Sequence, residues 1–213
     1  MHKFKFMDIE QNSDEWFNLR AGRITSSKLG TIMANYGKAF GVAAKKYAVN
    51  LAIEQITGKA IPSSYSNAHM ERGHEQEPIA RALYEDEYFC EVTNGGFFES
   101  EFIGCSPDGL VDGDGVIEIK SVIASVHYDT IKRGGFDPAY KWQFIGNLYF
   151  TGRDWIDFVS YCEQFPKGKQ LYTYRLNKKD YIKEFKMIDE RTQSFLELIK
   201  ETKETIINSN YIY

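Results

Sequence analysis

The chain has 213 residues, of which 43% are hydrophobic, 26% charged and 15% aromatic. It is long enough for one substantial core and has no apolar stretch of bilayer length, so we expect one domain over residues 1–213 and no membrane span. The formal net charge of −4 excludes a surface that is basic all round, so contact with nucleic acid would require basic residues gathered on one face.

In the first half of the chain, local signals predict helices. Ser13 precedes two acidic residues, which predicts a capped helix ending near Gly22. The hydroxyl run at residues 25–27 predicts a second helix with a hydroxyl side chain as its cap. Two longer helices are expected at residues 43–56 and 68–87.

From residue 88 the sequence changes to β-branched and aromatic runs broken by glycines, which predicts a three-stranded meander at residues 88–93, 97–105 and 116–122. Asp-Gly-Asp-Gly at residues 112–115 predicts the hairpin turn before the third strand, since Asp and Gly tolerate positive φ. Helices are expected at residues 125–132 and 139–149, strands at 155–161 and 171–176, and a long helix at the carboxy terminus. This order predicts an α/β fold with a mixed central β-sheet flanked by helices.

Cys90, Cys105 and Cys162 are widely spaced and form no Cys-x-x-Cys pair, which excludes a zinc ribbon or an iron–sulfur cluster. The first ten residues mix lysines, acids and aromatics and do not resemble an export leader. We therefore expect reduced cysteines in a cytoplasmic protein.

An acid and a base share one face of the third predicted strand. Residues two apart in a strand point the same way, so Glu118 and Lys120 lie together while Ile117 and Ile119 point into the opposite, apolar layer. An acid and a base on one face are unusual in a strand flanked by isoleucines.

Asp108 is expected to join this pair from the connection before the hairpin. Pro107 restricts the backbone there and Gly109 is expected to permit a sharp turn that brings the carboxylate of Asp108 toward Glu118. Two carboxylates hold Mg²⁺ well, and a lysine beside them offsets charge on a phosphoryl transition state. Taken alone, the string is also explained by a turn aspartate and a solvated Glu–Lys pair.

Four blocks within residues 16–150 show a resemblance to the PD-(D/E)XK nuclease superfamily and, within it, to the lambda exonuclease and YqaJ-like viral recombinase family. In the first block, EWFNLRAGRITSSKLG, the resemblance implies that Arg20 and Ser27 bind a 5′-phosphate. The second, MERGHEQEPIARALYE, implies that Glu77 is a metal-associated carboxylate. The fourth, AYKWQFIGNLYFTG, implies that Gln143 is directed at the active site.

The third block is SPDG followed by EIK. The resemblance implies that this block contains the catalytic centre. It implies that Asp108 and Glu118 are metal ligands, that the backbone carbonyl of Ile119 completes the ligand set, and that Lys120 is the catalytic lysine. The expected metal is Mg²⁺, with Mn²⁺ as an alternative because it takes similar oxygen ligands.

The resemblance further implies a restriction-endonuclease-like core with extra amino-terminal helices. It implies a 5′-to-3′ exonuclease on double-stranded DNA ends that releases mononucleotides and leaves 3′ overhangs for phage-type recombination. A homo-oligomer, by resemblance a trimeric ring, and a single-strand annealing protein are the expected partners, in a phage or its bacterial host. Candidates for the DNA-facing surface are Lys45, Lys46, Lys132, Arg133 and Lys141.

Two other functions remain open from the sequence. A structure-specific endonuclease or junction resolvase of the same fold would keep the metal site but would have no use for a 5′-phosphate pocket. A DNA-end-binding module that no longer cuts would not need Asp108, Glu118 and Lys120.

Overall fold

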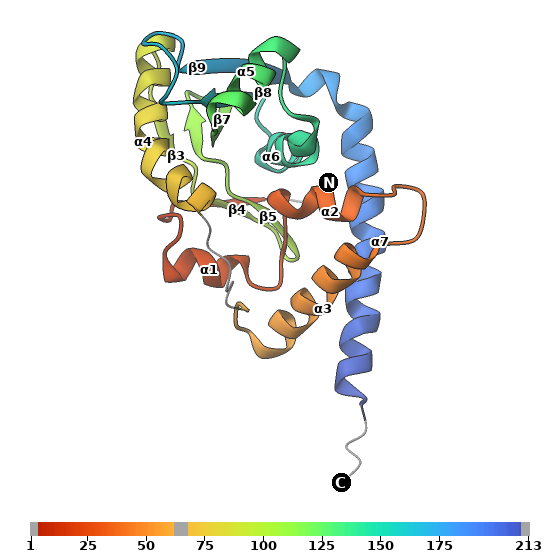
Figure 1. The fold of residues 1–213 in the computed structure, drawn as a ribbon. Helices are drawn as coiled ribbons and strands as arrows, with labels where there is room; N and C mark the ends of the chain where they lie inside the picture. The colour runs from red at the N-terminus through yellow and green to blue at the C-terminus, as the bar shows by residue number, and fades with distance from the viewer. Residues whose placement is uncertain (1–3, 62–67, 210–213) are drawn as a thin grey trace.

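The computed structural model describes residues 4–61 and 68–209, which form two β-sheets and the helices around them (Figure 1). The first three residues of the amino-terminal segment lie outside it. The α-helices are α1 (Asp14–Arg20), α2 (Leu29–Met33), α3 (Val42–Thr57), α4 (Ala68–Tyr88), α5 (Ala124–Arg133), α6 (Lys141–Thr151) and α7 (Ile182–Ile207). Short 3-10 helices are η1 (Ser26–Lys28), η2 (Pro138–Tyr140) and η3 (Lys178–Asp180).

Both sheets are mixed. The larger has the order β3 (Val92–Asn94), β6 (Gly109–Val111), β7 (Gly115–Ser121), β8 (Trp155–Tyr161) and β9 (Leu171–Asn177). The smaller has the order β1 (Lys5–Met7), β4 (Phe97–Glu99), β5 (Ile103–Cys105) and β2 (Ile24–Thr25). The parallel pairs are β7 with β8 and β2 with β5. The expected mixed α/β architecture with a long terminal helix is confirmed.

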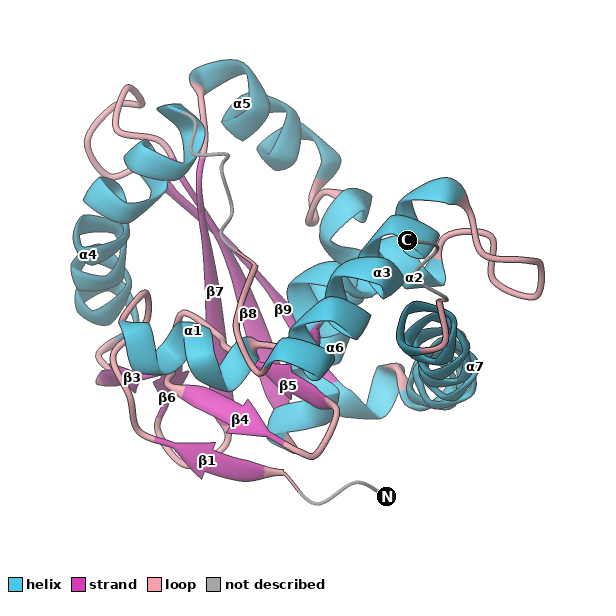
Figure 2. Ribbon diagram, turned by 90° about the horizontal axis from the view of Figure 1, so that it is seen from below, coloured by secondary structure: helices cyan, strands magenta, loops and turns pink. Residues whose placement is uncertain are grey.

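Strand β7 lies at the centre of the larger sheet, between α4 and α6 (Figure 2). Its two faces contribute to two hydrophobic clusters. Val116 packs with Phe144 and other residues of α6, whereas Ile117 and Ile119 pack with Ala80 and other residues of α4. The predicted alternation of side chains along this strand is therefore confirmed, and the even-numbered residues of β7 lie on its α6 side.

Most predicted helix positions are confirmed, but one predicted cap is wrong. Ser13 Oγ accepts a hydrogen bond of 3.2 Å from Trp16 N and caps α1. Thr25 instead ends β2, and Ser26 and Ser27 begin η1, which leads into α2. Neither helix has a side-chain cap hydrogen bond. Ser26 is turned inward because its hydroxyl binds Asn147 of α6.

The predicted three-stranded meander is wrong in its boundaries. Helix α4 continues to Tyr88, and Phe89 has a φ of 51°, which ends the helix and delays the strand to β3. Residues 97–105 form two antiparallel strands, β4 and β5, in the smaller sheet. Strand β6, which no local pattern indicated, pairs with β7 across the confirmed turn at residues 112–115, where Asp112 has a φ of 47°.

Within the described ranges, Cys90, Cys105 and Cys162 are free thiols, as expected. None of the helices in the described part of the chain combines the length and apolarity needed to cross a membrane.

Candidate functional site

Glu118 and Lys120 are joined on the α6 side of β7. The ammonium of Lys120 donates to Glu118 Oε1 at 2.6 Å, and Glu118 is only 1% exposed. The prediction that these residues share a face is confirmed. A buried carboxylate with an ammonium in direct contact is therefore the centre of the site.

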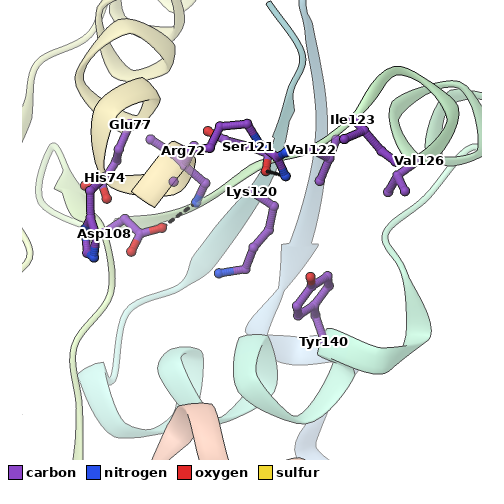
Figure 3. Close-up of a pocket in the computed structure, with 12 residues that line it drawn as sticks. Arg72, His74, Glu77, Asp108, Lys120, Ser121, Val122, Ile123, Val126 and Tyr140 are labelled. Carbon is purple, nitrogen blue, oxygen red and sulfur yellow. Dashed lines mark hydrogen bonds between the residues drawn. The ribbon is translucent and has the colours of Figure 1, made fainter. Parts of the chain in front are cut away.

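Asp108 is fastened to the same strand. Its Oδ2 accepts a hydrogen bond of 2.6 Å from the backbone N–H of Ile119, the residue between Glu118 and Lys120 (Figure 3). The Asp108 carbonyl accepts a second bond of 2.6 Å from Arg81 of α4. Asp108 thus reaches β7 as the sequence predicted.

The predicted reason for Gly109 is wrong. Gly109 is the first residue of β6 and does not have a positive φ. A Cβ there would lie 2.4 Å from Val92 Cγ1 and 3.0 Å from Ile117 Cγ2. Glycine is required because two strands approach closely, and this packing sets the position of Asp108.

Helix α6 supplies two amides to Glu118. Gln143 Nε2 donates to Oε1, in agreement with the prediction that this residue is directed at the site. Asn147, one turn later and fully buried, donates to Oε2 at 2.7 Å. The hydroxyl of Ser26 in turn donates to Asn147 Oδ1, which fixes the orientation of the amide.

Asn147 was not among the residues predicted from the sequence, although its spacing of four residues from Gln143 places both on one helix face. Gly146 beside it allows the approach of η1 and α2, since a Cβ there would lie 2.3 Å from Leu29 Cδ1.

Burial and charge act in opposite directions within this cluster. Burial, followed by the charge of Asp108, raises the pKa of Glu118 to about 8, and burial also raises the pKa of Asp108. Burial alone would lower the pKa of Lys120, but the carboxylates of Glu118 and Asp108 outweigh it and the pKa is raised. The ammonium therefore keeps its proton, and any proton that the site takes up goes to the two carboxyl groups.

Glu77 lies on α4 beside Asp108, but Arg81 also holds it. Arg81 Nη2 lies 3.2 Å from Glu77 Oε1 while it donates to the Asp108 carbonyl. Burial and the charge of Asp108 raise the pKa of Glu77 to about 7. Arg81, four residues after Glu77, is a second supporting residue that the sequence analysis missed.

A cavity of about 550 Å³ opens beside these groups. His74, Glu77 and Asp108 line one side, and Figure 3 shows Lys120 between them and Tyr140. The Lys120 ammonium lies 5.4 Å from the centre of the Tyr140 ring. This space is large enough to receive a nucleotide next to the charged centre.

The donor atoms fit a hard cation. Two carboxylates and a backbone carbonyl are oxygen ligands of the kind that Mg²⁺ takes while it keeps several waters. Among the side chains that the structure describes, residues 4–61 and 72–209, no three histidine, cysteine or acidic residues form a cluster that could hold a metal. The candidate set is therefore Asp108, Glu118 and the Ile119 carbonyl, and a direct bond from Glu77 stays a prediction.

Arg20 and Ser27 lie in the region before and after β2. The guanidinium of Arg20 lies over the Trp16 ring, 4.0 Å from its centre, and makes no ion pair with any carboxylate among the described residues. Ser27 is exposed, and its Oγ lies 3.2 Å from Thr25 Oγ1. A cation without an acidic partner and two hydroxyls are groups that bind a phosphate. Their assignment to a 5′-phosphate stays a prediction.

The predicted basic surface is only partly available. Lys141 donates to Glu184 at 3.1 Å and so has a partner within the protein. The other four candidates are exposed: Lys45 and Lys46 on α3, and Lys132 and Arg133 at the end of α5.

Comparisons with known proteins agree on one family. The model of the YqaJ-like viral recombinase domain matches residues 15–154. An alkaline exonuclease from Laribacter hongkongensis, LHK-Exo, is 32% identical, and the match covers 92% of this chain and 98% of that chain with a TM-score of 0.77. A structure of LHK-Exo in complex with dAMP matches over the same shares, 92% and 98%, at 32% identity with a TM-score of 0.78.

A phage-related exonuclease from Haemophilus somnus 129PT shares the fold, with 18% identity, coverage of 89% of this chain and 99% of that chain, and a TM-score of 0.62. No curated protein sequence matches the chain.

Proposed function

Because the chain belongs to the YqaJ-like viral recombinase domain family, we propose that it is a magnesium-dependent 5′-to-3′ exonuclease acting on double-stranded DNA ends. It releases mononucleotides from one strand and leaves 3′ overhangs for phage-type recombination. The relative from Laribacter hongkongensis is an alkaline exonuclease, and dAMP, which one of its structures holds, is a deoxynucleoside monophosphate of the kind such a reaction releases.

The observation that carries the proposal is the set of contacts around Glu118. A glutamate in the middle of a central strand would destabilise a core, yet Lys120, Gln143 and Asn147 all donate to it. Burial raises its pKa to about 8 in the protein alone. A strongly perturbed carboxyl beside a cavity, with a second carboxyl fastened to the next residue, indicates a site built for a cation.

In this proposal Asp108, Glu118 and the Ile119 carbonyl hold Mg²⁺. When bound there, Mg²⁺ would supply polarisation of the phosphoryl group and would lower the pKa of a water molecule. Lys120 remains protonated and donates to the scissile phosphate, where it offsets the growing negative charge. Gln143 and Asn147 keep Glu118 in one rotamer, so the carboxylate needs no reorganisation during the reaction.

Arg20 and Ser27 set the direction of digestion by binding the 5′-phosphate of the strand end. A guanidinium binds phosphate through two parallel N–H bonds, and the stacking on Trp16 fixes its plane. An end without this phosphate would then be positioned poorly at Asp108.

The proposal extends to the assembly. A homo-oligomeric ring, a trimer by resemblance, would gather the exposed lysines of α3 and the basic end of α5 around one DNA channel despite a net charge of −4. An annealing protein would receive the 3′ overhang in the cytoplasm of the bacterial host. Light scattering of the purified protein measures the oligomeric state.

The decisive experiment follows both ends of one duplex. A linear DNA labelled at the 5′ end of one strand and at its 3′ end is incubated with Mg²⁺ and, in parallel, with Mn²⁺ or EDTA. We expect early release of the 5′ label as a mononucleotide, with EDTA and Lys120→Ala abolishing release. Earlier release of the 3′ label would contradict the direction.

Arg20→Ala and removal of the 5′-phosphate separate the exonuclease from its alternatives. Both changes should slow end digestion and should not slow it further when combined. A structure-specific endonuclease would be indifferent to both changes, and a non-cleaving end-binding module would bind the duplex without releasing either label.

A further inference from the structure

The cavity beside Lys120 has two chemically different walls. Its charged wall carries Asp108 and Glu77, and its other wall carries Ile123, Val126 and Tyr140. Figure 3 shows these three residues on the side of Lys120 that is away from Asp108 and Glu77. A site that bound only a phosphate and a cation would have no use for the second wall.

Ile123 and Val126 do not serve the core. Ile123 is 45% exposed and Val126 is 39% exposed, whereas the buried face of α5 is formed by His127 and Thr130. Two β-branched aliphatic side chains therefore face solvent at the mouth of a cavity, where water would favour polar residues.

Ile123 is also the N-cap of α5, and it makes no side-chain cap hydrogen bond. Ser, Thr, Asp and Asn are the residues that stabilise this position, because their oxygens accept from the free N–H groups of the first turn. An exposed isoleucine there conflicts with the local preference, and such conflicts occur at functional sites.

Tyr140 adds an aromatic surface to the same wall as this pair. Its ring lies 5.8 Å from that of Phe144, which packs in the core behind it, and the Lys120 ammonium lies 5.4 Å from its centre. A flat apolar group placed against Tyr140 and the aliphatic pair would lie within one nucleotide of a phosphate held at Lys120.

We propose that Ile123, Val126 and Tyr140 form a binding subsite for a nucleobase that flanks the scissile phosphate. The inference rests on the proposed exonuclease function and adds where the base of the digested strand is bound. Aliphatic and aromatic surfaces contact the faces of all four bases, so the subsite holds the strand without reading its sequence.

A cycle of protein and substrate changes tests the proposal. The full chain and its Ile123→Ser/Val126→Ser variant digest 5′-phosphorylated duplexes with Mg²⁺ under single-turnover conditions, over a range of protein concentrations. The substrates are intact DNA and DNA with an abasic residue at the first or the second nucleotide. Serine is a favoured N-cap, so the Ile123 change should not unfold α5.

We expect the double variant to weaken apparent binding of intact DNA about tenfold, and to have little effect on the duplex whose abasic residue occupies the subsite. Tyr140→Ser, which removes the ring, should resemble the Ile123→Ser/Val126→Ser variant. Ile206→Ser, a matched control at an exposed aliphatic residue near the end of α7, should change nothing.

An equal loss on intact and both abasic substrates, or no loss on intact DNA, overturns the subsite. Failure of the unmodified chain to release nucleotides from intact DNA with Mg²⁺ instead overturns the exonuclease function. The two failures are therefore distinguished by the unmodified chain alone.

Discussion

The indole N–H of Trp16 donates a hydrogen bond of 2.8 Å to the hydroxyl of Ser106, 90 residues later in the chain. Trp16 also lies under the guanidinium of Arg20, and Ser106 lies two residues before Asp108. One side chain thus connects the candidate phosphate site with the candidate metal site. The Ser106 hydroxyl in turn donates a hydrogen bond of 2.7 Å to the carbonyl of Gly96, which directly precedes β4.

Trp16→Phe should reduce the preference for 5′-phosphorylated ends. Phenylalanine keeps an aromatic ring but loses the N–H, so the spacing between Arg20 and Asp108 is no longer fixed. We expect the ratio of digestion rates on phosphorylated and unphosphorylated ends to fall about fivefold, the factor for one net hydrogen bond. Initial rates on the two duplexes measure it.

Ser106→Ala breaks the same contact from the other side. If the Trp16–Ser106 hydrogen bond is responsible for the preference for phosphorylated ends, the Trp16→Phe/Ser106→Ala variant should lose little more of that preference than either single variant. Fully additive losses would show that Trp16 and Ser106 act separately.

Asn147→Ala should damage both stability and activity. It leaves Glu118 Oε2 without its amide donor in a buried environment, which costs about 1–3 kcal/mol of unfolding free energy. Loss of such a supporting contact also typically lowers activity or metal affinity about 10–100-fold. Denaturant unfolding and steady-state digestion measure the two effects.

Gln143→Ala is the comparison for Asn147→Ala. Glu118 Oε1, which Gln143 binds, keeps Lys120 as a partner, so the stability loss should be smaller. Equal stability losses would contradict the importance that we assign to burial.

Glu77→Gln distinguishes a metal ligand from a partner of Arg81. If Glu77 holds the ion, the Mg²⁺ concentration for half-maximal rate should rise, while Arg81→Met, which leaves the carboxylate in place, should not raise it. If Glu77 only orients Arg81 toward the Asp108 carbonyl, both variants should lower stability alike and leave the Mg²⁺ dependence unchanged. Magnesium titrations of the digestion rate decide between them.

Without metal, the protein should lose stability as the pH rises. The pKa of Glu118 is 4.5 when unperturbed and is raised to about 8 by burial in the folded state. The folded state therefore binds the Glu118 proton more tightly than the unfolded state does. The contribution of this proton to the free energy of unfolding is fully present below about pH 4.5 and is lost as the pH rises through about pH 8. Thermal unfolding in EDTA across this range measures the decline.

Magnesium should reverse this decline, because the ion takes the place of the proton between the carboxylates. The rise in melting temperature on adding Mg²⁺ should therefore be larger above about pH 8 than near pH 5, and Glu118→Gln should remove most of the difference. A stabilisation by Mg²⁺ that does not depend on pH would contradict the proposed ligand role of Glu118.

The sequence predicted the parts of the fold that depend on local chemistry. Ser13 marked the start of α1, the Asp-Gly turn joined β6 to β7, and alternation placed Glu118 and Lys120 together. Strands β1 and β2 were missed because they have three residues or fewer and pair with β4 and β5, which lie far along the chain. No local pattern can indicate such pairing.

The composition and motifs of the chain by themselves determined the family resemblance, the α/β class and the identity of Asp108, Glu118, Lys120 and Gln143 as site candidates. Only the tertiary structure decided which groups hold them: Ser26 and Asn147 lie 121 residues apart and meet behind Glu118, and Arg81 meets the Asp108 carbonyl across 27 residues. The reason is physical. Residue type and spacing fix which atoms can donate or accept, whereas the packing of distant segments fixes which of those atoms are buried together and must bind each other.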